Sequence, residues 1–452
     1  MDLLVPLLVL AASGVIAGWL PGRLAGRGGA SRLPSAPGRT VVWLARRRLG
    51  AGGTERRLAV LVVTAGLGML LFALSAERST ANSAEDRVAL AAGAEGVATL
   101  PGSWALDDEA VLVPPEDPKG DPLAAPVPGV RNPPLPPGNT VVWRGDVTSL
   151  LDDDQKDLLV IDPARFAEVA LWGRGPDLAA ARDAVRALAA DPVEPDGTPR
   201  AIVVADPTSA QVGSVRMEVG FTRRDVAVAS RVDAFPGMRG RPMYVVSAEY
   251  MWPKLGRDDP RLRPRNQHPG PLFVQTFLWS SGGAAGVEAV TTPRGLELDR
   301  TSTATELRQE AGYLATSRAR GYQLAIAGYL ALLSVLTLCI YAQRTAVLRR
   351  PTDLMLARIG LGRGRIARAR AVEFVLLSTI AYGAAVAGVA VLAPLGGRLL
   401  DDQPGLLPRF AFQLSPVGLA VTAGAAVLAT ALAVALTTVR SASAEEDAYR
   451  DD

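Results

Sequence analysis

Five apolar windows, each long enough to cross a lipid bilayer, divide the chain. A transmembrane helix needs about 20 mainly apolar residues. The windows that meet this requirement are residues 3–20, 58–74, 322–341, 371–396 and 412–439. This pattern predicts an α-helical multi-pass membrane protein with five transmembrane helices.

A long polar block, residues 77–320, separates the second window from the third. Inside it, apolar runs such as "AIVVADP" and "PMYVVSAEYM" alternate with amphipathic stretches such as "DLAAARDAVRALAADP". Such alternation indicates a compact α/β domain. Helical stretches at both ends of the block, next to the windows, predict partly hydrated stalks that leave the membrane. The proline-rich segment 114–138 is predicted to be an exposed loop.

Charge then assigns the sides of the membrane, because short loops rich in arginine stay in the cytoplasm. The loops between windows one and two and between windows three and four hold nine and eight arginines, each against one acidic residue. Block 77–320 holds 34 acidic and 27 basic residues, a net charge of −7. We therefore expect that block and the N-terminus to lie outside, and the C-terminus to lie in the cytoplasm. A cleaved signal peptide is the alternative for the first window, but the basic residues follow it instead of preceding it.

These observations predict a sequence of ten segments. They are a first transmembrane helix (1–20), a basic cytoplasmic loop (21–57), a second transmembrane helix (58–76), an extracytoplasmic α/β domain with helical stalks (77–320), a third transmembrane helix (321–343), a cytoplasmic segment (344–370), a fourth transmembrane helix (371–397), a short outer loop (398–411), a fifth transmembrane helix (412–439) and an acidic cytoplasmic tail (440–452).

Composition adds few candidates for chemistry. The chain has one cysteine, Cys339, inside the third window, and one histidine, His268, in a loop, so neither has a like partner for a disulfide or a metal site. No phosphate-binding loop and no nucleophile motif occurs, and the acidic run 152–157 is interpreted as a solvated turn. We expect no enzymatic activity, no cofactor and no metal in this chain. The formal charge of +3 resides in membrane-flanking arginines and does not predict a nucleic-acid partner.

The segment "RRPTDLMLARIGLGRGRIARARAVEFVLL", residues 349–377, carries the most informative pattern. A proline and an acidic residue in the first turn favour a helix that starts near Pro351. At 100° per residue, Met355, Leu356 and Ile359 share one face. Leu354, Ala357 and Leu361 occupy another, with Arg358 at its edge. We interpret the segment as a short rod packed on two sides.

Three glycines, Gly360, Gly362 and Gly364, are predicted to end this rod. The arginines that follow are expected to contact anionic lipid head groups, each contributing about 1 kcal/mol. They are Arg363, Arg365, Arg368 and Arg370. Glu373, the one acidic residue within the windows, is expected to pair with Arg370 or with another arginine of the loop such as Arg368, or to have a role of its own.

The order of these elements resembles the FtsX-like permease domain of type VII ABC transporters, the MacB and LolC/E group. The residues that carry the resemblance are Leu356, Ile359, Gly360, Ile366 and Glu373, followed by a membrane helix with Gly383 and Gly388. It extends over residues 57–440. The additional first helix is similar to the C-terminal half of large actinobacterial permeases, in which two such units are joined.

The resemblance implies a permease subunit in a bacterial plasma membrane. Its segment after the third helix would be the coupling helix that docks on a separate, dimeric P-loop ATPase, which would bind ATP and Mg²⁺. The coupling residues would be Asp353, Leu354, Met355, Leu356, Arg358, Ile359 and Gly360. A second permease half is implied, either a copy of this chain or a different one, and an extracytoplasmic protein is a further candidate partner. Movement of the outer domain would serve export or mechanotransmission.

Two other function classes remain open at this stage. A membrane-anchored sensor or scaffold would regulate an extracytoplasmic partner without transport. A membrane-tethered enzyme would act through the outer block, which lacks a recognisable catalytic motif.

Overall fold

The computed structural model describes eleven stretches of the chain. They are residues 4–26, 37–51, 53–106, 112–113, 135–152, 154–219, 222–250, 273–294, 298, 300–401 and 407–450. The chain divides into two compact units. The helical unit holds Met1–Thr80, Thr316–Asp402 and Phe410–Asp452, and the sheet unit holds Ala81–Ala315 and Gln403–Arg409.

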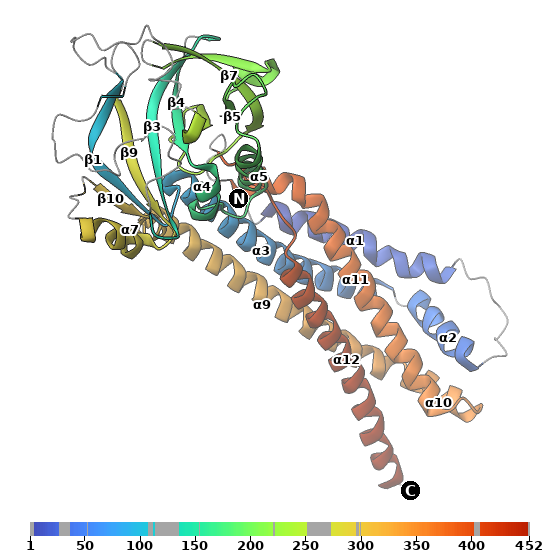
Figure 1. Cartoon of the computed structure of the whole chain (residues 1–452). Coiled ribbons are helices and arrows are strands. Elements are labelled where there is room, and N and C mark those ends of the chain that lie inside the picture. Colours follow the sequence, from blue (N-terminus) through green and yellow to red (C-terminus); the bar gives the residue numbers. More distant parts are fainter. Residues whose placement is uncertain are drawn as a thin grey trace. The chain divides into compact units, whose positions relative to one another are not determined.

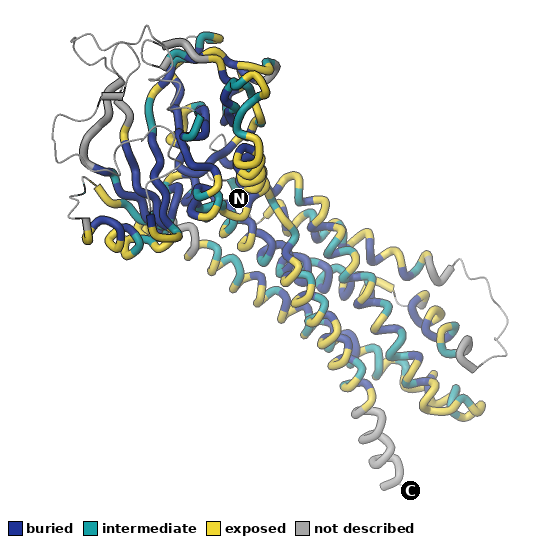
Figure 2. The backbone as a smooth tube through the Cα atoms, viewed as in Figure 1, coloured by how far each residue is buried: buried dark blue, intermediate teal, exposed yellow. Residues whose placement is uncertain are grey.

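Seven helices form the described part of the helical unit (Figure 1). They are α1 (Leu4–Gly26), α2 (Pro37–Ala51), α3 (Thr54–Ala92), α9 (Ala311–Leu348), α10 (Arg350–Arg358), α11 (Arg363–Leu400) and α12 (Pro416–Arg450). Five of them, α1, α3, α9, α11 and α12, are long and apolar enough to cross a membrane, and each overlaps one predicted window. Their exposed residues include many large apolar ones, and Figure 2 marks the exposed positions in yellow.

Helix α3 is the centre of the helical unit. Of its apolar window 67% is buried, against 28% to 39% for the other four. Small and hydroxyl residues allow close approach: the Thr64 hydroxyl lies 3.3 Å from the Ala381 carbonyl of α11, and the Ser75 hydroxyl accepts from the Ser415 N–H at 3.1 Å. Ser334 of α9 donates to the Val62 carbonyl at 2.9 Å. Side-chain hydrogen bonds between small residues are typical of helix contacts inside membranes.

Helix α2 lies in the segment that was expected to be a basic loop. Its buried residues Leu44, Ala45, Arg48 and Leu49 recur at helical spacing, and the helix packs against α1 and α11. The arginines of α2 make this stripe hard to recognise in the sequence. Together α2 and α10 occupy one end of the helical bundle (Figure 1).

The sheet unit is built on ten described strands. They are β1 (Gly96–Leu106), β2 (Leu112–Val113), β3 (Asn139–Ser149), β4 (Gln155–Ile161), β5 (Arg200–Val204), β6 (Ser214–Val219), β7 (Thr222–Val232), β8 (Met243–Ser247), β9 (Phe273–Ser280) and β10 (Arg300–Thr303). Their order is β10-β1-β9-β3-β4-β8-β5-β7-β6, with β2 beside β1. The end of β3 also pairs with β6, so that six strands close a ring from β3 through β4, β8, β5 and β7 to β6.

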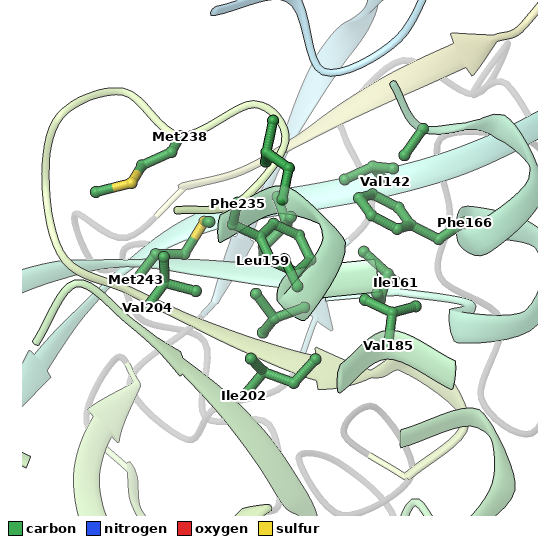
Figure 3. Packing of buried hydrophobic residues seen from close by; sticks show 14 of the residues in the cluster. Val142, Leu159, Ile161, Phe166, Val185, Ile202, Val204, Phe235, Met238 and Met243 are labelled. Atoms are coloured by element: carbon green, nitrogen blue, oxygen red, sulfur yellow. The ribbon is translucent and has the colours of Figure 1, made fainter. Parts of the chain in front are cut away.

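Both faces of the central strands are buried, which explains their continuous apolar runs. In β4, Leu158 and Val160 face one core cluster, whereas Leu159 and Ile161 face the other. Helices α4 (Pro163–Val169) and α5 (Pro176–Ala190) cover the second cluster, shown in Figure 3 with Phe166 and Val185 against the strands. The α/β sheet region predicted between the second and third windows is therefore confirmed.

The remaining described helices of the sheet unit include α7 (Gly283–Thr291), which packs on β1 and β9, and the short α8 (Ala304–Arg308). Thr303 and Glu306 form a capping box at the start of α8. Most of the proline-rich segment 114–138 and His268 lie outside the described residues. Cys339 is a half-buried free thiol in α9.

Candidate functional site

Helix α10 begins and ends where its sequence dictates. Pro351 stands in the first turn, where a missing N–H costs no hydrogen bond, and Asp353 places a carboxylate at the positive end of the helix. Gly360 follows the last helical residues with φ = +92°, a conformation that favours glycine. Its N–H donates to the Ala357 carbonyl at 3.1 Å. Gly362 precedes α11, but Gly364 lies inside that helix, so the prediction that Gly364 interrupts the chain is wrong.

The exposed face of α10 is apolar. Leu354, Met355 and Ile359 are 54%, 69% and 80% exposed, and Arg358 is exposed between them. Leu356 is half-buried on the opposite side, beside buried Asp353 and half-buried Ala357. Of the residues predicted on one face, Met355 and Ile359 are exposed and Leu356 is half-buried, whereas Leu354, predicted on the other face, is exposed. Two large apolar side chains on α10 and a third on the residue that follows it form a compact surface for a partner.

The other side of α10 is held by a cluster of charged residues, here called the Asp353 cluster. It consists of Arg48, Arg349, Asp353, Arg370 and Glu373. Arg48 of α2 donates to one oxygen of Asp353, and Arg370 of α11 donates to the other at 2.5 Å. Arg370 also donates to the Thr437 carbonyl of α12 at 3.3 Å. One carboxylate thus ties α10 to α2 and α11, and through Arg370 to α12.

Glu373 belongs to the same cluster, and its partner is an arginine of the loop, as expected. It is 2% exposed, and its Oε2 lies 2.6 Å from Nη1 of Arg349. Arg370, the first partner considered, is engaged by Asp353 instead, and Arg368 is exposed. Since a buried carboxylate needs a charged partner, Arg349 explains why an acidic residue is tolerated one turn into the apolar part of α11.

The arginines expected at the membrane interface have different surroundings. Arg363, Arg365 and Arg368 are exposed. Arg370 is half-buried, with both terminal nitrogens engaged by Asp353 and Thr437. The hydrogen bonds of Arg370 are made within the protein, which argues against the predicted contact of this arginine with lipid head groups.

The sheet unit contains a second buried charged group, the Lys156 cluster. Its members are Lys156, Asp152, Asp206, Thr208, Ser209 and Tyr244. The ammonium nitrogen of Lys156 lies 2.6 Å from Asp206 Oδ2 and 2.8 Å from Asp152 Oδ2. The Lys156 and Asp206 side chains are each 1% exposed. The interpretation of residues 152–157 as a solvated turn is thus wrong, because Lys156 and Asp157 are buried in strand β4.

The electrostatics of this cluster follow from its hydrogen bonds. Burial alone would raise the pKa of Asp206, but hydrogen bonds from Lys156, Ser209 and Thr208 outweigh it and lower the pKa well below its usual range. For Lys156, burial opposes the charged form, yet hydrogen bonds to Asp152 and Asp206 raise its pKa. The lysine is therefore held as an ammonium ion, which is suited to an ion pair and not to a general base. Within the described ranges, no group of His, Cys, Asp and Glu residues has the arrangement of a metal site.

The chain matches no protein-family model, and no curated protein shows significant similarity to it.

Proposed function

We propose that this chain is the membrane subunit of an ABC transporter of the FtsX-like type, and that α10 is the helix that docks on a separate ATPase. The observation that supports the proposal is the arrangement of α10, which exposes Leu354, Met355 and Ile359 while Asp353 fixes its opposite side. An apolar face on a helix anchored from behind suits insertion into a groove of a partner.

The proposal includes the orientation of the chain. The arginines around α2 and α10 favour the cytoplasm, where an ATPase would bind, and the acidic sheet unit would lie outside. ATP binding and hydrolysis by the partner would then move the α10 end of the bundle. The long helices would carry that movement to the sheet unit, for export or for control of an outer partner.

The test begins with the full chain, affinity-tagged and purified from membranes of its native host. Material that contains the proposed partner should hydrolyse ATP, because this chain has no phosphate-binding loop of its own. Met355→Asp and Ile359→Asp should each reduce the co-purified ATP hydrolysis by about tenfold or more, since a buried carboxylate at an apolar contact is strongly unfavourable.

Leu151→Asp is the matched control, because Leu151 is an exposed leucine of the sheet unit, 45% exposed. It should leave the co-purified hydrolysis unchanged. Wild-type protein without associated hydrolysis would contradict the transporter assignment and favour a sensor or scaffold. Hydrolysis that is insensitive to both α10 variants would remove α10 as the docking helix.

A further inference from the structure

Helix α2 lies outside the four-helix unit that carries the family resemblance, yet it contacts the proposed docking helix directly. The contact joins the last turn of α2 to the first turn of α10. Two hydrogen-bonding interactions form this contact. The donor belongs to α2 in one of them and to the residue before α10 in the other. Arg48 of α2 donates to the Asp353 carboxylate, and Arg349, the residue before α10, donates to the Arg48 carbonyl at 3.3 Å.

One of the two interactions satisfies a backbone group that a helix end leaves open. The last four carbonyls of a helix have no partner within it, and the Arg48 carbonyl is among them because α2 ends at Ala51. Arg349 supplies the missing donor. In return, the first turn of α10 presents the Asp353 carboxylate, and the Arg48 guanidinium binds it. Each of the two helix ends therefore binds a group that belongs to the other.

This contact is shielded from water. Arg48 and Asp353 are each 7% exposed, and Leu44, Ala45 and Leu49 hold α2 against its neighbours on the same side. Charge pairs buried to this degree are only weakly screened by salt. Without Arg48, Asp353 would keep Arg370 as a partner but lose the cation on its other oxygen; without Asp353, the buried Arg48 guanidinium would lose the carboxylate that it binds. The position of α10 should therefore depend strongly on Arg48.

We propose that α2 positions α10 for its partner, with Arg48 as the positioning residue and Asp353 as its acceptor. This inference rests on the proposed function of α10 for its biological meaning, but the mechanical link between the two helices can be tested alone. Any displacement of α10 would reach α2, and through α2 the packed helix α1, in addition to α11. The N-terminal helices would thus form a second path of movement beside the four-helix unit.

The test is hydrogen–deuterium exchange with mass spectrometry on the full chain in lipid nanodiscs. In Arg48→Gln, amide exchange in residues 350–359 should become roughly 10- to 100-fold faster, the range expected for loss of one charge-assisted hydrogen bond. Arg48→Lys keeps a cation beside Asp353 and should remain within about threefold of wild type. Asp353→Asn should accelerate exchange in both α10 and the last turn of α2, because the link is mutual.

Arg344→Gln is the matched control. Arg344 forms an ion pair with Glu55 at 2.8 Å near the same end of the bundle, but its side chain is 65% exposed. It should leave exchange in 350–359 unchanged. Unaltered exchange in α10 of Arg48→Gln would overturn the proposal. An equal rise across α3, α9 and α11 would also overturn it, since it would show a general role in stability.

The yield of co-purified ATPase distinguishes this inference from the proposed function. If the ATPase co-purifies, its yield with Arg48→Gln should fall, and Arg48→Lys should restore it. If no ATPase co-purifies with wild type, the proposed function fails while the exchange experiment still decides the link between α2 and α10. If the exchange effect is found but the yield with Arg48→Gln is unchanged, the link stands and its positioning role for the partner is overturned.

Discussion

Asp206→Asn is expected to lower the free energy of unfolding of the sheet unit by about 3–5 kcal/mol, the cost of breaking a buried ion pair. Asp206 accepts from Lys156 at 2.6 Å and from the Tyr244 hydroxyl at 3.0 Å, and also from Ser209. Asparagine keeps the size of the side chain but removes the charge. Lys156 would then remain buried with Asp152 as its one carboxylate partner among the described residues.

A urea titration of the full chain, read by proteolysis of the sheet unit, would measure this loss. Asp225→Asn is the control, because Asp225 pairs with Arg216 at 2.7 Å on the surface, with both side chains more than half exposed. Such exposed pairs contribute about 0–1 kcal/mol. Equal effects of the two substitutions would show that burial of the Lys156 cluster does not determine its energetic importance.

The same variant has a predicted dependence on pH. The pKa of Asp206 is lower in the folded protein than in the unfolded chain, so its ionised form stabilises the fold above the ordinary aspartate pKa of about 3.9. This contribution is lost as pH falls below that value toward the pKa of the folded state. The difference in stability between wild type and Asp206→Asn should therefore shrink in acid. A difference that stays constant from neutral pH to pH 3 would argue against the ionised pair.

Gly66→Val is expected to destabilise the helical unit by about 3 kcal/mol or more, because it forces α3 away from α9. A Cβ atom at Gly66 would lie 2.6 Å from the Leu330 carbonyl oxygen and would overlap the Ser334 hydroxyl. A backbone carbonyl cannot turn aside as a flexible side chain can. The substitution would also displace Ser334 from its hydrogen bond to the Val62 carbonyl.

Gly328→Val provides the comparison within α9. No atom lies within 4 Å of the position where its Cβ would be, so the added side chain has room. Thermal unfolding of the full chain in nanodiscs should show a clear loss for Gly66→Val and a small change for Gly328→Val. Similar melting temperatures for both variants would indicate that helix propensity, and not the contact between α3 and α9, sets the result.

The elements that the sequence predicts correctly have long or continuous apolar runs. The five windows are long and apolar, and β5 and β8 are continuous apolar runs because both of their faces are buried. Strand β6 was missed because Val215 and Met217 alternate with polar residues, which leaves no apolar run to notice. Helix α2 was missed for a similar reason, because its short buried stripe lies among arginines.

In the candidate site, the sequence predicts the start of the helix but not the ion pairs that its residues form. The start of α10 follows from Pro351 and Asp353, which are local signals. The partner of Asp353 is not a local signal, because Arg48 lies 305 residues earlier and many arginines are available to compete for each carboxylate. Glu373 illustrates the same point: the nearest arginine in sequence, Arg370, is turned toward Asp353. Pairing among so many cations is decided by tertiary packing.

The central place of α3 also constrains the order of assembly during synthesis. Its neighbours α9, α11 and α12 follow only after more than two hundred residues of the sheet unit. At about 5–20 residues per second, α3 would wait on the order of 10–40 s after leaving the ribosome, with α1 as an early partner. Gly14 and Gly18 of α1 lie against Leu61 and Arg57 of α3. The first helix would thus cover part of the α3 surface until α9, α11 and α12 have been synthesised.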